Sequence, residues 1–123
     1  MTASTTTPTM TEELIGYVAV DSGQLMICDP CYLSGEFSAN EYSPAVANED
    51  KMYPFTYNGV CGMTISDRSH GQMMFANGGV GAGVGFRSGL GDGMYPVYAT
   101  IVNDDVWGRR IASVRIVMME EGY

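Results

Sequence analysis

Positive charge is scarce in this 123-residue sequence. Lysine occurs once, at Lys51, and 6 Lys and Arg residues stand against 14 Asp and Glu residues, which gives a formal net charge of -8. Proteins that bind nucleic acids or anionic membrane surfaces draw their affinity from clustered Lys and Arg. The sequence therefore predicts no nucleic acid and no membrane among the partners. An acidic body suits a basic protein or a cationic ligand.

Long apolar runs are missing as well. No stretch of about 18 apolar residues exists, so the sequence offers no candidate transmembrane helix. Residues 1–13 are rich in Thr and lack both the basic start and the apolar centre of a signal peptide. We expect a cytoplasmic or particle-bound protein in which residues 1–13 form a flexible polar leader. Residues 14–123, in a chain with 46% hydrophobic residues, are expected to form one domain with its own core.

Cysteine is limited to three residues, an odd number that fits a reducing compartment better than a disulfide scaffold. Cys28 and Cys31 have the spacing of half a zinc site, which Cys61 and His70 could complete as a Cys₃His set. The pair could instead form a redox motif, but that chemistry favours a helix directly after the first thiol, and none is expected here. The simplest interpretation is that the thiols pack as small hydrophobic groups. No cofactor is then expected, with zinc kept as a weak alternative.

Convincing helical patterns are absent, and 16 glycines disfavour helix throughout. The pattern predicts a mostly β fold, a single-domain β sandwich or partly open barrel of about seven short strands. Residues 34–54 read as a long irregular loop with one short helix near residues 45–50. Three Gly-punctuated apolar segments follow, over residues 55–65, 72–76 and 80–86, where bulges or close strand packing are expected.

Two hairpins are predicted at the ends of this region. Residues 14–20 and 24–28 flank an Asp-Ser-Gly turn, and residues 95–102 and 110–118 flank a second turn. Alternation in the final strand predicts that four side chains face inward, namely Ala112, Val114, Ile116 and Met118. Trp107, the single tryptophan, falls in the second turn, where burying its ring requires a fold-back or a partner. We therefore predict an interface at Trp107.

Three carboxylates lie in turns beside Gly or Pro, at Asp21, Asp29 and Asp92. Turns from different hairpins can meet at one end of a β domain, where clustered carboxylates could hold a cation, a guanidinium or ribose hydroxyls. The plain alternative is that Asp is common in turns because it bonds its own backbone. A hydrolase built from these groups and His70 is a further hypothesis, although no nucleophile elbow or triad pattern is present.

Glycine is concentrated between residues 78 and 93. Gly-rich loops can hold phosphates, but the run 81–85 leads into a strand and matches neither the dinucleotide fingerprint nor a P-loop. Close strand packing and tight turns explain these glycines better.

Two segments carry a family resemblance. The first is Asp21-Ser22-Gly23-Gln24-Leu25 continuing to Asp29-Pro30-Cys31-Tyr32, and the second is Ser88-Gly89-Leu90-Gly91-Asp92-Gly93 leading into Tyr95-Pro96-Val97-Tyr98. Together they resemble a group of small uncharacterised proteins of actinobacteria and their phages, akin to a domain-of-unknown-function family. The resemblance implies a shared β scaffold in which the two segments meet. It implies no catalytic residues.

These observations favour a non-enzymatic small binding protein, phage-encoded, that captures a small ligand or a host protein. The predicted ligand-binding residues come from the two segments, namely Asp21, Asp29, Tyr32, Asp92 and Tyr95. The alternatives are a structural or accessory component of a phage particle and the small hydrolase. The protein would act in the cytoplasm of a host cell or on the virion, with host or phage proteins as partners, and a homo-oligomer is left open.

Overall fold

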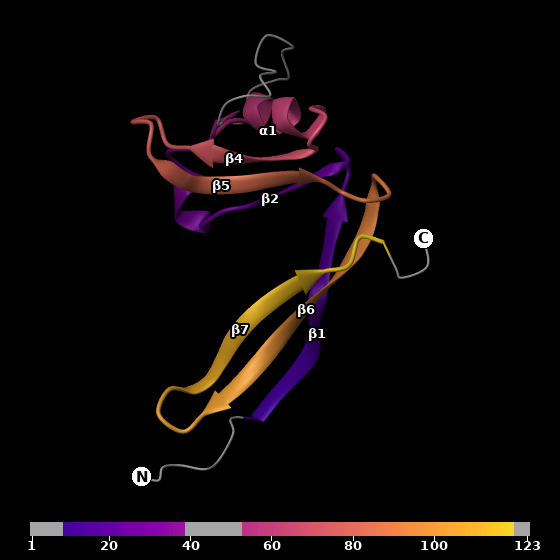
Figure 1. Ribbon diagram of the computed structural model, residues 1–123, viewed down its shortest axis with the longest axis vertical. Coiled ribbons are helices and arrows are strands. Elements are labelled where there is room, and N and C mark those ends of the chain that lie inside the picture. Colours follow the sequence, from indigo (N-terminus) through magenta and orange to yellow (C-terminus); the bar gives the residue numbers. More distant parts are fainter. Residues whose placement is uncertain (1–8, 39–52, 120–123) are drawn as a thin grey trace. The chain divides into compact units, whose positions relative to one another are not determined.

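The computed structural model describes residues 9–38 and 53–119. Contacts within the chain divide it into two compact units. Residues 20–92 hold a four-stranded sheet with a helix, here called the four-stranded unit, and residues 1–19 with 93–123 hold a three-stranded sheet, here called the three-stranded unit (Figure 1). Each unit is built from its own sequence pattern.

The sheet of the four-stranded unit has the order β2-β5-β4-β3. Its strands are β2 (Gln24–Ile27), β3 (Tyr53–Pro54), β4 (His70–Met74) and β5 (Val80–Arg87). β5 pairs antiparallel with both β2 and β4, and β3 runs parallel to β4. A bulge between Met73 and Met74 confirms the expected irregularity, and a short 3₁₀ helix, η1 (Pro30–Tyr32), follows β2.

Helix α1 (Tyr57–Thr64) lies over one face of this sheet (Figure 1). The prediction of an apolar strand segment over residues 55–65 is wrong here. The hydroxyl of Thr56 accepts a hydrogen bond from the backbone N–H of Gly59 at 2.9 Å, which caps the first turn. At the other end, Nε of Arg87 donates to the carbonyl of Thr64 at 2.9 Å, where a cation also suits the helix dipole. These two contacts stabilise a helix that its glycines alone would disfavour.

The core of the four-stranded unit lies between α1 and the sheet. Its buried members are Tyr53, Phe55, Val60, Met63, Met73 and Ala82, and partly buried Met26, Cys28, Tyr32, Phe37 and Phe75 pack against them. Glycines allow the close approach of the two layers. A Cβ at Gly85 would lie 2.6 Å from Sδ of Met63 in α1, and one at Gly83 would lie 2.9 Å from Cε of Met73, its partner on β4 within the sheet. The prediction that these glycines serve close packing is therefore confirmed.

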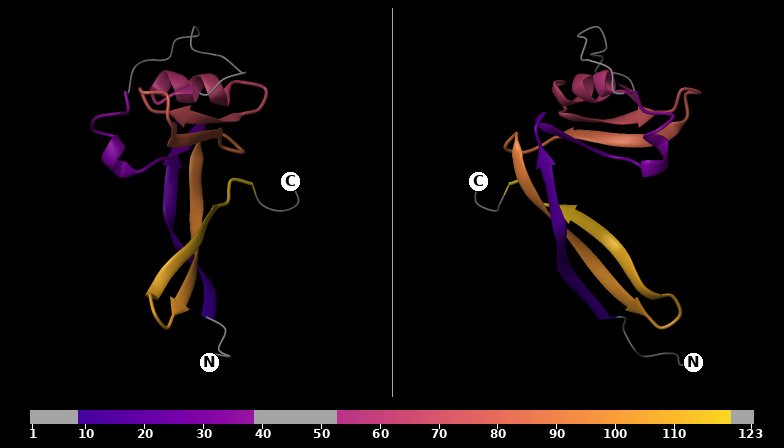
Figure 2. Two further views of the ribbon diagram at one scale, coloured as in Figure 1. Left: turned by 60° about the vertical axis from the view of Figure 1, so that its left-hand side comes forward. Right: turned by 180° about the vertical axis from the view of Figure 1, so that it is seen from behind.

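The three-stranded unit has the strand order β1-β6-β7. Its strands are β1 (Thr9–Val20), β6 (Gly93–Asp104) and β7 (Gly108–Ile116). The antiparallel β6–β7 pair confirms the second predicted hairpin (Figure 2), and its register shifts between Thr100 and Ile101. β1 and β6 each contain 12 residues, so these strands are longer than the short strands predicted.

Three details of the prediction change in this unit. β1 begins at Thr9, so residues 9–13 belong to a strand and not to the leader. β1 pairs in the sheet of β6 and β2 pairs with β5, so the first predicted hairpin is wrong: the Asp-Ser-Gly residues connect two sheets instead of closing a hairpin. Val114, expected to face inward, is 56% exposed, and Ala112 is exposed beside the register shift. Alternation places Val114 on one face of the sheet, but it does not show whether that face is covered.

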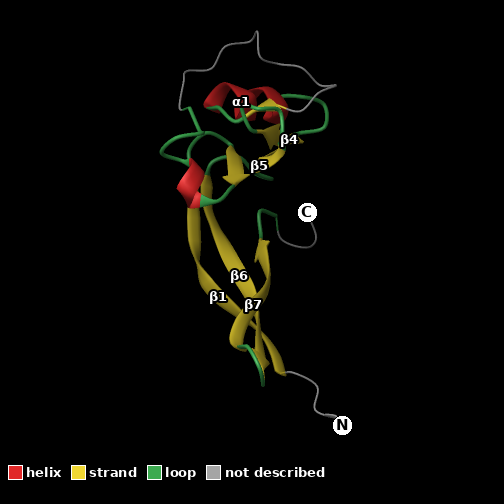
Figure 3. Cartoon of the chain, turned by 90° about the vertical axis from the view of Figure 1, so that its left-hand side faces the viewer, coloured by secondary structure: helices red, strands yellow, loops and turns green. Residues whose placement is uncertain are grey.

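The mostly β fold is confirmed, with seven strands in two open sheets over the described residues (Figure 3). Most of the predicted loop, including its helix near residues 45–50, lies outside the described residues. Within the ranges 9–38 and 53–119, no helix is both long enough and apolar enough to span a bilayer.

Candidate binding sites

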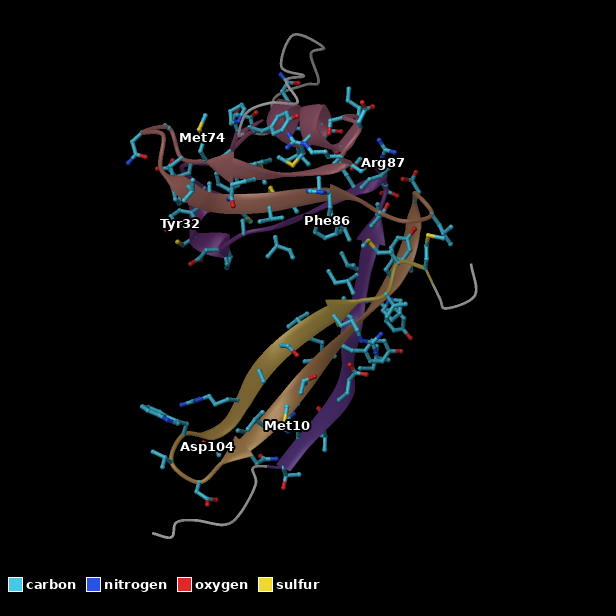
Figure 4. All side chains as sticks on the ribbon, viewed as in Figure 1. Met10, Tyr32, Met74, Phe86, Arg87 and Asp104 are labelled. Carbon is cyan, nitrogen blue, oxygen red and sulfur yellow. The ribbon has the colours of Figure 1, made fainter. Side chains whose placement is uncertain are left out.

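The tip of the β6–β7 hairpin presents two apolar side chains. Oδ1 of Asp104 accepts hydrogen bonds from the backbone N–H groups of Val106 at 2.7 Å and of Trp107 at 2.8 Å, and Gly108 has a φ of 75°. This arrangement fixes the turn locally, since one carboxylate orders both residues that follow it. Val106 is 81% exposed and Trp107 is 67% exposed. Figure 4 shows Asp104 at this end of the hairpin.

The electrostatics of the tip agree with this geometry. The backbone hydrogen bonds from Trp107 and Val106 hold the pKa of Asp104 below its ordinary value, because they stabilise the charged carboxylate. An ordered turn that exposes an indole ring costs little conformational entropy when a partner covers it. Trp is also among the residues that most often dominate the energy of protein interfaces. The predicted interface residue Trp107 thus lies at an exposed, pre-ordered position.

Two ion pairs cross the three-stranded sheet. Arg115 bonds both carboxylate oxygens of Glu12, at 2.7 and 3.1 Å, and its guanidinium lies 4.9 Å from the centre of the Tyr98 ring. Arg109 bonds Glu13 at 2.9 Å. The contact with Arg115 lowers the pKa of Glu12. Such exposed pairs add little stability, but they show which side chains lie on the same face of the sheet.

The four-stranded unit contains a pocket of about 300 Å³ between α1 and the start of β2. Its surface is mostly apolar and carries no formal charge, and the residues that line it are Ser22, Gln24, Tyr57, Cys61, Thr64 and Ile65. The Thr64 hydroxyl donates to Oε1 of Gln24 at 2.6 Å, and Nε2 of Gln24 donates to Sγ of Cys61 at 3.4 Å. The side chain of Gln24 is thereby oriented from both ends.

Tyr57 joins the same network from the first turn of α1. The hydrogen bond with Cys61 raises the pKa of Tyr57, and repulsion from the thiolate form of Cys61 raises it further. The phenol therefore stays neutral at physiological pH. The pocket offers hydroxyl, amide and thiol groups without a formal charge, which suits a small neutral ligand that forms hydrogen bonds.

The structure brings the two family-like segments together, but only in part. The backbone N–H of Ser88 donates to the carbonyl of Gly23 at 3.0 Å, so the loops that carry Asp21 and Asp92 meet. Asp29 follows the other end of β2, a four-residue strand about 13 Å long. The structure thus joins the loop of Asp21 to the loop of Asp92 and leaves Asp29 at the other end of β2.

The other predicted ligand residues, Asp29, Tyr32 and Tyr95, are held by contacts or burial within the fold. Asp29 accepts a hydrogen bond from the backbone N–H of Cys31 at 3.0 Å and so caps η1. Tyr32 packs edge-to-face on Phe75 with ring centres 5.0 Å apart, at the same end of the sheet (Figure 4). Tyr95 belongs to the three-stranded unit and is buried there. Asp29 and Tyr32 thus have clear structural roles.

The four candidate zinc ligands do not converge, and in the described ranges no three His, Cys, Asp or Glu side chains are grouped to hold a metal ion. Cys61 is in α1, Cys28 packs against the core, and His70 is exposed at the start of β4. Asp29 raises the pKa of Cys31 by a hydrogen bond to its thiol, burial and charge repulsion adding to the effect.

Sequence reasoning missed the pocket residues Gln24, Tyr57 and Thr64. The misreading of residues 55–65 as a strand separates them, because only a helix turn places Tyr57, Cys61 and Thr64 on one side. Thr is a residue type favoured at helix N-caps, so Thr56 is the signal that could have indicated where α1 begins. Gln24 carries no pattern of its own and is found only through its contacts.

Comparisons of the chain with protein-family models, with curated proteins and with solved structures give no match.

Proposed function

We propose that this chain is a non-enzymatic binding protein that captures a partner protein through Trp107 and Val106 at the tip of the β6–β7 hairpin. The observation that carries the proposal is the exposure of both side chains on a turn ordered by Asp104. A large apolar ring in water at a fixed position is a typical anchor for a pocket in a partner. If the chain is phage-encoded, as its resemblance implies, the partner is a host or phage protein.

Photo-crosslinking from the tip tests this proposal. A benzophenone amino acid replaces Trp107 in the full chain, expressed in the cells that produce it, and a matched protein carries the same group at Met94. Met94 is exposed to a similar extent, 65% against 67%, in the same unit but away from the tip. We expect one defined protein adduct from position 107 and none from position 94.

Binding of the purified adduct partner then gives a quantitative test. Trp107→Ala should weaken the affinity by about 30-fold, the size of an interface hot spot, whereas Met94→Ala should leave it unchanged. Equal adducts from both positions, or equal affinity of Trp107→Ala and the unmodified chain, would show that the tip is not the binding site.

The pocket beside α1 favours a second function, the capture of a small neutral ligand. Native mass spectrometry of the protein isolated from its producing cells would show a bound small mass. Gln24→Leu should remove that mass, because the oriented amide is lost, while Gln72→Leu serves as a control. Gln72 lies on β4, where its amide bonds the carbonyls of Met73 and Gly83 and does not line the pocket. A mass retained in Gln24→Leu would exclude the pocket.

The other hypotheses have less support. A component of a phage particle would use the same exposed tip to contact a neighbouring subunit, and this stays a prediction. The hydrolase hypothesis needs His70 close to Asp21. His70 begins β4 at the same end of the sheet as Asp21, but β5 lies between β4 and β2, so these two strands are about 10 Å apart. That separation does not support shared acid–base chemistry.

A further inference from the structure

One face of the three-stranded sheet carries exposed apolar side chains from both outer strands. The register pairs Tyr98 with Arg115, and the guanidinium lies over the Tyr98 ring, so Tyr98, Arg115 and Glu12 share one face. Neighbouring residues along a strand point to opposite faces. Ala99 and Ile101 of β6 therefore lie on the other face.

The partners of these two residues on β7 follow from the register. Ala99 pairs with Val114 and Ile101 pairs with Ile111, the extra residue between them being absorbed by the register shift. Asn103, on the same face of β6, pairs with Arg109. The ion pair between Arg109 and Glu13 then places Glu13 on this face as well.

Alternation along β1 adds two more residues, since Ile15 and Tyr17 follow Glu13 by two and four positions. We call this surface the apolar face and define it by Ile15, Tyr17, Ile111 and Val114. Each of the four is 51–60% exposed. They lie on the two outer strands on either side of buried Ala99 and Ile101 of β6, and together form the kind of apolar patch that monomeric proteins rarely leave in water.

We propose that the apolar face is the interface of a homodimer, covered by the same face of a second copy of this chain. Charge favours this occupant. The chain has a net charge of -8, but Glu13 and Arg109 on the apolar face pair with each other and leave it neutral. Two copies can therefore approach through this face without bringing unpaired carboxylates together.

The size of the face sets the expected strength of the dimer. A face of three strands about 4.8 Å apart and about 30 Å long covers roughly 430 Å², so two copies bury roughly 900 Å². That area is below the roughly 1,200–2,000 Å² of stable interfaces, so we expect a weak dimer that dissociates on dilution. A second copy also offers a sheet of equal length and twist, as sheet-on-sheet packing requires.

Sedimentation velocity of the full chain over a range of concentrations tests this inference. A reducing agent is included so that exposed Cys31 forms no disulfide between copies. We expect a shift from monomer to dimer as the concentration rises. A species that stays monomeric at all concentrations, or one that grows beyond a dimer, would overturn the proposal.

Matched substitutions on the two faces of β7 locate the interface. Val114→Glu should weaken dimerisation at least 10-fold, because it adds a charge to the apolar face of each copy. Ser113→Glu adds the same charge next to it, on the opposite face, and should dimerise like the unmodified chain. Ile15→Glu on β1 is a second variant that should weaken association equally. Dimerisation of Val114→Glu and Ile15→Glu at unmodified strength would overturn the proposal, whatever happens at the hairpin tip.

Discussion

The four-stranded unit and the three-stranded unit are both built around an antiparallel β pair, yet their apolar residues differ in burial. In the four-stranded unit, α1 covers one face of the sheet and buries Met63 and Met73 completely. In the three-stranded unit, Ile15, Ile111 and Val114 are more than half exposed on one face. A sheet needs a second layer on its apolar face; α1 is that layer in the first unit, and we propose that a second copy of the chain provides it in the second.

Glycine marks the same difference. At Gly85 of β5 a Cβ would collide with Met63 of α1, and at Gly83 it would collide with Met73 of the neighbouring strand β4. At Gly16 of β1, by contrast, a Cβ would meet nothing within 4 Å. Glycine in a strand therefore has a packing role in one unit, and the described structure gives it none at Gly16.

The largest expected effect is that of Gly59→Ala in the four-stranded unit. A Cβ at Gly59 would lie 1.9 Å from the carbonyl oxygen of Pro54, a backbone atom that cannot move without displacing α1 or β3. We expect the free energy of unfolding to fall by more than about 3 kcal/mol in denaturant titrations followed by circular dichroism. Gly35→Ala, in the same unit with open space around it, should change stability little. Equal stability of the two variants would contradict the close helix–sheet contact.

Truncation of one methionine in each unit compares the two directly. Met63→Ala removes a fully buried side chain and should lower the free energy of unfolding by about 2 to 3 kcal/mol. Met94→Ala, at a position 65% exposed in the three-stranded unit, should change it by less than about 0.5 kcal/mol. Thermal and denaturant unfolding measure both. A large loss in Met94→Ala would show that this side chain is covered in solution, and the contrast between the units would fail at that point.

The smallest expected effect is local to the hairpin tip and depends on pH. The pKa of Asp104 is lowered in the folded state, so its contribution is complete above the ordinary value of 3.8 and is lost as the pH falls through the lowered value. Fluorescence of Trp107, the single tryptophan, should report loosening of the turn in that acidic range. Asp104→Asn keeps an acceptor but cannot titrate, so its fluorescence should lack this transition. The same transition in Asp104→Asn would assign it to another group.

The sequence predicted the class of fold and the second hairpin because alternation and turn residues are local signals. It did not predict α1, whose stability comes from the Thr56 cap, the Arg87 contact and close packing on Gly85. Nor could it assign β1 to β6, since strand pairing across more than 70 residues has no local signal. The exposed position of Trp107 followed from its turn, whereas the pocket around Gln24 depends on contacts across the unit.

The packing of Met63 on Gly85 also bears on how the four-stranded unit would respond to oxidants. The thioethers of Met63 in α1 and of Met73 in β4 are shielded from solvent while the helix packs on the sheet. A sulfoxide oxygen on Met63 would need the space that a Cβ at Gly85 lacks, 2.6 Å from Sδ. If the helix lifts while peroxide is present, the oxidised side chain no longer fits beneath it. Met63 would then stay oxidised after each opening of the helix until a reductase restored the thioether.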